Sequence, residues 1–360
     1  MEKKLVGLTA MAVFACIASG ALADEAAGKV ALMLPDAKTS RYDTKDRPYF
    51  EAKLKELCAK CEVIYNNANG DAGLQLNAAQ AALTAGAKVL VIMAVDTTAA
   101  AAIADLAKAQ GVPVIAYSRL IANSDGVTYA VLFDNRGIGE IQARGLVKGL
   151  AEQGKANPKI VMINGSPTDS NATLFKEAAH EVFDPLVKAG KLTIAKEYDT
   201  PDWSPDRAQE EMQQALTALG NSVDGVYAAN DGTASGVIAA MRATNVAPWP
   251  PVTGLDADLA ATQRILVGQQ YMSVYLPLSP LADTAAQLAY DLLTHAPVPA
   301  DLTKGETIDN GKAKVPLVKI SSAAVYKADI KSALVDNGFW TIPEICTAEY
   351  ADACKKAGLE

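Results

Sequence analysis

The sequence predicts an α/β protein with two doubly wound, Rossmann-like lobes, each a parallel sheet covered by helices on both faces. Short apolar runs without strict alternation, such as "KVALML" at Lys29–Leu34, are typical of strands buried on both faces. These runs alternate with helical segments, which favours parallel strands joined by crossover helices. The alternation restarts after Asn135, and 360 residues are enough for two domains.

The first half of the chain shows this alternation clearly. Strands are predicted over residues 29–34, 62–68, 88–95, 112–117 and 129–133, with helices over residues 46–57, 73–85 and 97–110. Asp96 or Thr97 is the expected cap of the third helix, because a short polar side chain can accept a hydrogen bond from the first helical turn.

The second half repeats the pattern and then returns to earlier sheets. Strands are predicted over residues 159–164, 192–198, 225–230 and 252–255, with helices over residues 137–153, 171–189, 206–219 and 233–244. A strand at 269–276, a helix at 280–294 and a strand at 315–321 follow. We expect these last segments to complete sheets begun earlier, so the chain crosses between the lobes more than once.

The N-terminus has the pattern of a secretory signal peptide over residues 1–23. Lys3 and Lys4 precede an apolar run, and "ALA" stands directly before Asp24 as a cleavage site. A membrane anchor and a lipoprotein cut at Cys16 are alternatives, but the small residues favour cleavage and Phe14 suits a lipoprotein signal badly. No later apolar run approaches the roughly 20 residues of a membrane span. A periplasmic mature protein is therefore predicted.

Charge and cysteine content narrow the function further. The formal net charge of −8 argues against a nucleic-acid partner, which would require a basic face. An even number of cysteines in an exported chain indicates disulfides, although four cysteines allow three connectivities. With only two histidines in the chain, we favour local bridges over zinc or redox chemistry at "CAKC", pairing Cys58 with Cys61 and Cys346 with Cys354.

Polar side chains follow most of the predicted strands. Ligands of parallel sheets bind outside the carboxyl ends of the strands. Helix capping alone explains Asp96, Asp169 or Asp256 taken singly. It does not explain fork-shaped hydrogen-bonding groups (Arg41, Arg119, Asn135, Asn171, Asn230, Asp231) beside aromatic rings (Tyr42, Phe133, Trp203). Adjacent hydroxyls and the flat C–H faces of a sugar match this combination.

Enzymatic motifs are sparse. No Gly-rich phosphate loop follows the first strand, and no serine stands in a G-x-S-x-G elbow. His180 and His295 occupy helical positions and are expected to be structural. Two carboxylates are the usual catalytic groups of a glycosidase, so Asp231 and Asp256 leave that activity as an alternative function.

Five stretches in order resemble the xylose-type branch of the periplasmic sugar-binding proteins, the type I (ribose-like) receptors of ABC transporters: "YSRLI", "LFDNRGIGEIQARGL", "NGSPTDSNATLF", "AANDGTASG" and "GLDADLAATQRI". The resemblance covers nearly the whole mature chain. It implies a three-crossover hinge, a sugar in the cleft, closure by hinge motion and a membrane permease as partner. It implies no cofactor, no bond made or broken, and a monomer.

The resemblance also implies domain bounds. The N-terminal lobe takes residues 28–134 plus about 277–307. The C-terminal lobe takes residues 135–276 plus about 308–345. A tail at 346–360 is tied by a disulfide. Crossings are expected near 133–136, near 275–277 and after Thr307.

Site residues follow position by position from the resemblance: Arg41, Tyr42, Ser118 and Arg119 in the first lobe, Asp134 and Asn135 at the hinge, and Asn171, Trp203, Asn230 and Asp256 in the second lobe. Asp231 is expected to cap or orient its neighbour.

Three positions depart from the family pattern. Ser118 stands where the family usually has Asp, Leu255 where the xylose binders have Gln, and Leu276 where they have Lys. Losing an ionised acceptor and a cationic donor removes two charge-assisted hydrogen bonds, each worth roughly 1.5–3 kcal/mol. The ligand is therefore hypothesised to be a related pentose, a deoxy sugar or a polyol.

Two other functions remain open from the sequence. A sensor that presents bound sugar to a chemoreceptor or histidine kinase would use the same closed form. A sugar hydrolase or isomerase would use the same cleft.

Overall fold

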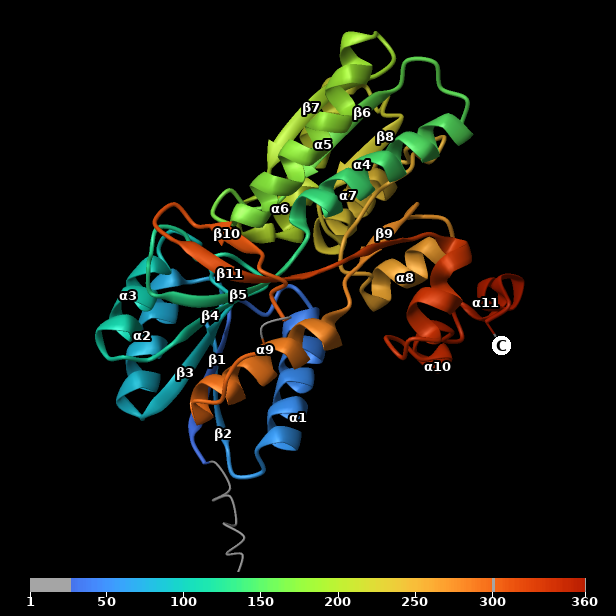
Figure 1. Ribbon diagram of the computed structural model, residues 1–360. Helices are drawn as coiled ribbons and strands as arrows, with labels where there is room; N and C mark the ends of the chain where they lie inside the picture. The colour runs from blue at the N-terminus through green and yellow to red at the C-terminus, as the bar shows by residue number, and fades with distance from the viewer. Residues whose placement is uncertain (1–26, 300–301, 360) are drawn as a thin grey trace, which may run out of the picture.

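The computed structural model describes residues 27–299 and 302–359, and two α/β lobes are visible, joined by several chain segments (Figure 1). The predicted signal peptide, residues 1–23, lies outside the described residues. Within the described part, no helix combines the length and apolar character needed to cross a membrane.

The first lobe is built on a seven-stranded sheet. Its strand order is β10-β11-β5-β4-β3-β1-β2, and only β10 pairs antiparallel to its neighbour. The strands are β1 (Lys29–Leu34), β2 (Glu62–Asn67), β3 (Ala87–Ile92), β4 (Val114–Tyr117), β5 (Val127–Phe133), β10 (Thr307–Asp309) and β11 (Lys314–Ile320).

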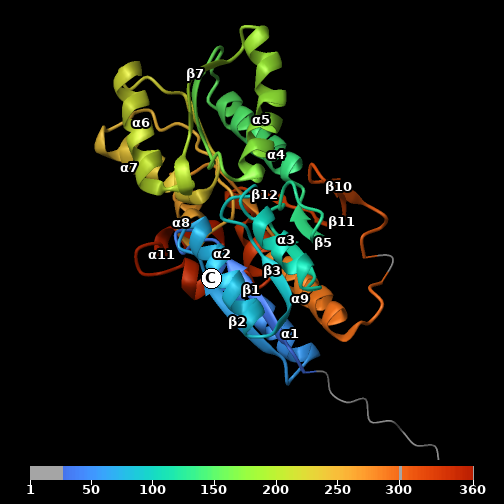
Figure 2. The same cartoon turned by 90° about the vertical axis from the view of Figure 1, so that its left-hand side faces the viewer.

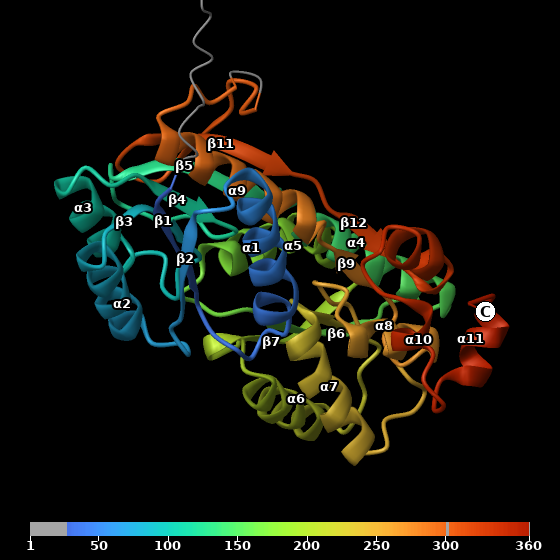
Figure 3. The ribbon, with the colours of Figure 1, turned by 90° about the horizontal axis from the view of Figure 1, so that it is seen from below.

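Helices cover both faces of this sheet, as the buried apolar strands predict. α1 (Arg47–Leu57) and α9 (Leu278–Thr294) lie side by side on one face, and α2 (Ala72–Thr84) and α3 (Ala101–Ala109) lie on the other (Figure 3). Successive side chains of β1 enter different cores. Val30, Leu32 and Leu34 pack with α1 and α9, and Ala31 and Met33 pack with α2 and α3.

The second lobe repeats the plan around a smaller sheet. Its regular core is β7 (Thr193–Asp199), β6 (Lys159–Asn164) and β8 (Gly225–Ala228), in that order. The predicted strand at 252–255 joins only through single bridges, Val226 with Val252 and Leu255 with Val274. It thereby links β8 to the antiparallel pair β9 (Ser273–Tyr275) and β12 (Ala323–Val325).

Four helices sandwich the second sheet, which lies between the pair α4 (Asn135–Glu152) and α5 (Ser170–Lys188) and the pair α6 (Pro205–Leu219) and α7 (Asp231–Ala243) (Figure 2). α10 (Ile342–Ile345) and α11 (Ala351–Ala357) pack against α8 (Leu259–Leu266). The sequence pattern does not predict α8, α10, α11, β10 or β12, because each is too short to show a clear period.

The chain crosses between the lobes at three places. β5 leads into α4, β9 leads into α9, and β11 leads into β12. The predicted boundary near residue 307 is wrong: residues 314–320 form β11, which pairs in parallel with β5 of the first sheet, Leu317 opposite Ala130. The third crossing therefore falls between Ile320 and Ala323. A strand's apolar pattern does not say which sheet it joins.

Both predicted disulfides are present. Cys58 bonds to Cys61 directly after α1, and Cys346 bonds to Cys354 across the last two helices. The second bridge closes the C-terminal segment onto itself.

Close packing of α4 on α5 depends on Gly139. A Cβ atom at this position would lie 2.3 Å from the carbonyl oxygen of Phe175, which is backbone and cannot rotate away. Gly232 in α7 is a useful contrast, because its added Cβ would meet nothing nearer than 3.5 Å.

We predict that Gly139→Ala lowers the melting temperature by several degrees, because forcing a methyl group into a packed interface costs about 1–3 kcal/mol. Gly232→Ala is the matched control and should leave the melting temperature unchanged or slightly raised, since alanine favours helix. Thermal unfolding followed by circular dichroism checks both. Equal melting temperatures for the two variants would contradict the packing argument.

Candidate functional site

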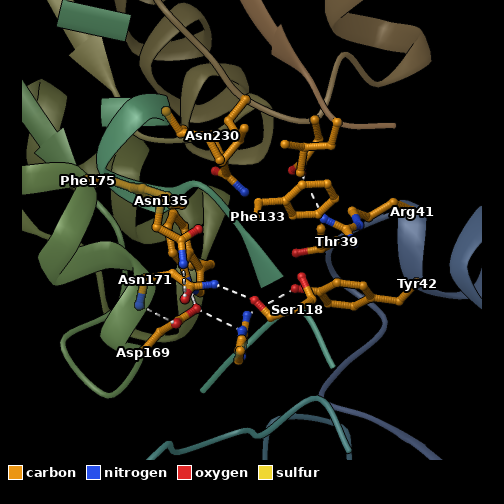
Figure 4. A pocket seen from close by; sticks show the side chains of 16 residues that line it. Thr39, Arg41, Tyr42, Ser118, Phe133, Asn135, Asp169, Asn171, Phe175 and Asn230 are labelled. Carbon is orange, nitrogen blue, oxygen red and sulfur yellow. Dashed lines mark hydrogen bonds and ion pairs between the residues drawn. The ribbon is translucent and has the colours of Figure 1, made fainter. Parts of the chain in front are cut away.

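A pocket with about 430 Å³ of empty space lies between the two lobes, at the carboxyl ends of their strands. Every predicted ligand-contacting residue except Asp134 lines it: Arg41, Tyr42, Ser118, Arg119, Asn135, Asn171, Trp203, Asn230 and Asp256. Figure 4 shows these side chains converging from both lobes.

The prediction that Asp134 contacts the ligand is wrong. Asp134 is exposed, it lies outside the pocket, and its Oδ1 accepts a hydrogen bond from the Gly137 N–H at 3.3 Å as the N-cap of α4. A cap residue turns its side chain back onto the first helical turn, and the next residue, Asn135, is the one that faces the cleft.

Other pocket residues were missed or assigned another role. Thr39, Ile138 and Phe175 line the pocket but gave no signal, since a loop threonine and apolar helix positions have common structural explanations. Asp169 was assigned to capping alone. The three departures from the family pattern, Ser118, Leu255 and Leu276, all lie on the pocket wall.

Arg41 is held by a carboxylate beneath it. Its Nε and Nη2 donate to the two oxygens of Asp46 at 2.7 and 2.8 Å, and the Tyr117 hydroxyl donates to the same carboxylate. A π-helical turn, Tyr42–Asp46, brings Asp46 below Arg41. The remaining nitrogen, Nη1, lies 3.7 Å from Oδ1 of Asp256 in the second lobe. Arg41 is thus fixed with one side of its guanidinium group turned to the cleft.

Arg119 joins the two lobes. Its Nε lies 2.8 Å from Oδ2 of Asp169, while its two other nitrogens donate to the Ala94 carbonyl oxygen and the Tyr42 hydroxyl. Asp169 also accepts from Trp203 Nε1 at 3.1 Å and, as the N-cap of α5, from the Asn171 N–H at 2.9 Å. Capping and ion pairing are therefore combined in one carboxylate.

A chain of amides crosses the same side of the cleft. Asn135 Nδ2 donates to Asn171 Oδ1, and Asn171 Nδ2 donates to the Ser118 carbonyl oxygen, each at 2.8 Å. Asn135 Oδ1 is buried and has no hydrogen-bond partner within the described part of the chain. Asn230 Oδ1 caps α7 by accepting from the Thr233 N–H, and its nitrogen points toward the pocket (Figure 4). Both amides thus offer groups to a ligand.

Trp203 supplies the largest flat surface. Its ring meets Phe175 edge to face, with centroids 6.4 Å apart. The ring lies so close to Gly165 that an added Cβ there would stand 2.1 Å from it. Trp203 also has a positive φ of 54°. A left-handed backbone conformation is uncommon for a bulky residue. Strained conformations of this kind are found most often at functional sites.

Asp256 is a buried carboxylate with a left-handed backbone (φ 101°). Burial raises its pKa to about 7, although the Arg41 guanidinium acts in the opposite direction. Asp231 behind it accepts from Gln270 Nε2, Ser273 Oγ and the Asp258 N–H at 2.7–3.0 Å. Asp231 therefore positions the loop that carries Asp256, whereas the cap of α7 is Asn230.

Of the residues weighed for catalysis, Asp256 lines the pocket and the others do not. Asp231, one of the two carboxylates that left a glycosidase open, does not line the pocket, and protein donors surround it. His180 contacts Asp184 and Glu197 outside the pocket, and His295 ends α9. Across residues 27–299 and 302–359, no cluster of His, Cys, Asp and Glu side chains is suited to hold a metal ion.

Comparison with known sequences finds a matching family model and several similar proteins. The model of the periplasmic binding protein domain matches residues 30–297. The D-xylose-binding periplasmic proteins of Haemophilus influenzae and Escherichia coli are each 35% identical, over 87% and 86% of this chain and 90% of each relative. The multiple sugar-binding periplasmic receptor ChvE of Rhizobium radiobacter is 30% identical over 95% of this chain and 99% of its own.

Solved structures agree. An ABC transporter solute-binding protein of Clostridium phytofermentans with bound β-D-glucose superposes with a TM-score of 0.81 at 29% identity, covering 88% of this chain and 99% of that one. A carbohydrate transporter solute-binding protein of Chloroflexus aurantiacus in complex with D-glucose gives 0.80 at 30% identity, with 88% and 97% coverage. With two lobes, three crossings and a polar pocket between them, the chain belongs to the periplasmic binding protein family and has its type I fold.

Proposed function

We propose that this protein is the periplasmic receptor of a sugar importer of the ABC type. It binds one monosaccharide in the cleft between its lobes, closes over it by hinge motion, and presents the closed form to a membrane permease. It acts as a monomer, needs no cofactor, and releases the sugar unchanged. The relatives named as sugar-binding proteins support this assignment.

The observation that carries the proposal is a buried polar atom without a partner in an interlobe pocket that also holds aromatic rings. Asn135 Oδ1 is that atom. Asn230, Arg41 and Trp203 line the same pocket. A buried polar atom without a partner costs free energy, which a sugar hydroxyl would recover. A micromolar dissociation constant corresponds to about −8.2 kcal/mol, which a handful of charge-assisted hydrogen bonds with ring stacking can supply.

Closure is supported by contacts that join the lobes. Besides Arg119 with Asp169, the Thr97 N–H donates to the Thr168 carbonyl oxygen at 3.1 Å. Outside the pocket, Lys45 Nζ donates to the Phe339 carbonyl oxygen and lies 4.0 Å from the Trp340 ring centre. Opening the hinge would break these contacts, so the closed form is stabilised from both lobes.

The test is direct binding of monosaccharides. Purified protein should gain several degrees in melting temperature with at least one pentose, hexose, deoxy sugar or polyol, and isothermal titration should give one site per chain. Asn135→Ala should weaken that binding about tenfold, because the ligand loses a buried acceptor. Asn337→Ala, on an exposed turn, is the control and should bind as wild type. No stabilisation by any of these sugars, or conversion of the sugar to a product, would overturn the proposal.

Asp169→Asn tests the role of the ion pair in closure. The amide keeps an acceptor for the α5 cap but leaves Arg119 buried without a counter-charge. Removing one partner of a buried pair costs about 3–5 kcal/mol, and this cost applies to the closed state because opening lets water reach Arg119. We expect sugar dissociation in stopped-flow measurements to accelerate on the order of 100-fold.

Asp184→Asn is the matched control on the same helix. Its carboxylate is exposed, contacts His180, and lies outside the interlobe pocket. Dissociation at the wild-type rate is expected for this variant. If Asp169→Asn also released sugar at the wild-type rate, the ion pair would have no part in closure.

The pKa of Asp256 predicts a pH dependence of stability without sugar. Between about pH 4 and 7 the unfolded carboxyl group ionises, while the folded one, with its pKa of about 7, stays protonated. The folded state then binds more protons, so this group lowers the free energy of unfolding as pH rises. Asp256→Asn removes that loss.

The melting temperature of Asp256→Asn relative to wild type should therefore be a few degrees higher at pH 8 than at pH 5. Scanning fluorimetry of the sugar-free proteins measures it. Asn337→Ala, which changes an exposed turn and removes no ionisable group, should show no such trend. A difference between Asp256→Asn and wild type that is the same at both pH values would contradict the assignment.

A further inference from the structure

One part of the pocket wall is apolar and comes from two chain segments of the second lobe, one of which leads into the second crossing. Leu255 and Leu276 both line the pocket, and each is at most 5% exposed. Leu255 pairs with Val274, and Leu276 lies two residues beyond Val274. Side chains two residues apart on a strand point to the same face, so the two leucines are neighbours on one surface.

Two further apolar side chains extend this surface toward the hinge. Phe133 ends β5 at the first crossing, and Ile138 lies in the first turns of α4, which packs against β9. We call Phe133, Ile138, Leu255 and Leu276 the apolar wall. None of the four can donate or accept a hydrogen bond through its side chain.

Several polar groups on the other side of the pocket are already bound to protein partners. Asp169 accepts from Arg119, Trp203 and the α5 backbone, and Asn171 pairs with Asn135 and Ser118. A hydroxyl group pressed against the apolar wall would therefore be buried without a partner. A pyranose has one edge that suits such a wall. Ring carbons 2, 3 and 4 carry hydroxyls directly, whereas ring carbon 5 carries hydrogen, methyl or hydroxymethyl.

We propose that the apolar wall selects sugars whose ring carbon 5 carries hydrogen or a methyl group, and selects against those with a hydroxymethyl group. The ligand is then a pentopyranose or a 6-deoxyhexopyranose, and Leu255 and Leu276 are specificity-determining residues. This inference rests on the proposed sugar-binding function and adds a substrate class to it. The hydrogen-bonding edge of the sugar meets Asn135 and Asn230, and the carbon 5 edge meets the leucines.

Two matched sugar series test the proposal by isothermal titration. D-xylose, 6-deoxy-D-glucose and D-glucose differ only at ring carbon 5, and so do L-arabinose, 6-deoxy-D-galactose and D-galactose. In whichever series binds, the hexose should bind about 10- to 100-fold more weakly than the 6-deoxyhexose, because a hydrophobic site discriminates to about this extent. The ratio of pentose to 6-deoxyhexose shows whether hydrogen or methyl is preferred.

Leu276→Gln should narrow the gap between hexose and 6-deoxyhexose at least threefold, since the amide offers the hydroxymethyl group a partner. Leu276→Met keeps the wall apolar and should retain the wild-type ratio. Each ratio is measured within one protein preparation, so a general loss of stability does not alter it. If Leu276→Gln fails to fold, the affinity ratio of hexose to 6-deoxyhexose in the wild type and in Leu255→Gln still tests the proposal.

The outcomes separate the two levels of inference. A hexose that binds as tightly as its 6-deoxy counterpart overturns the wall's selectivity and leaves the sugar-receptor function standing. Absence of binding by every sugar in both series, and by the wider panel above, overturns both. A polyol bound more tightly than either ring series overturns the pyranose assignment alone.

Discussion

The buried ion pair between Arg119 and Asp169 is the contact on which the arrangement of this protein depends. Arg119 follows a strand of the first lobe and Asp169 caps a helix of the second, and both are nearly inaccessible to solvent. Two charges leave water only when their geometry repays the cost of desolvation. They can do so here only where the two lobes meet, so the position of the lobes and the arrangement of the site depend on the same contact.

Around this pair each lobe fixes its own polar side chains before a ligand arrives. Asp46 holds Arg41 from below, and Asp231 positions the loop that carries Asp256. Because these supports lie within single lobes, the hinge can move without dismantling them. A ligand then has only to satisfy the groups that face the cleft, such as Asn135 Oδ1. Preorganisation of this kind lowers the entropic cost of binding.

Much of the site could be predicted because parallel sheets place ligand groups at strand ends. Ser118 and Arg119 follow β4 directly, and Asn230 follows β8 within two residues. The same rule failed for Asp134, which is exposed as a helix cap while Asn135 faces the pocket. Which of two adjacent polar residues faces the cleft depends on the direction in which the chain leaves the strand. Residue type alone does not predict that direction.

The sequence by itself determined the two runs of alternating elements and most of the polar groups, and it favoured the two disulfide pairs, because periodicity, cysteine spacing and strand-end chemistry are local properties. Only the tertiary structure decided that β11 joins the first sheet, that Asp169 pairs with Arg119, and that Leu255 and Leu276 share one surface. These facts join residues far apart in the chain. Such contacts are fixed by which surfaces meet when both lobes fold and close, and not by any single segment.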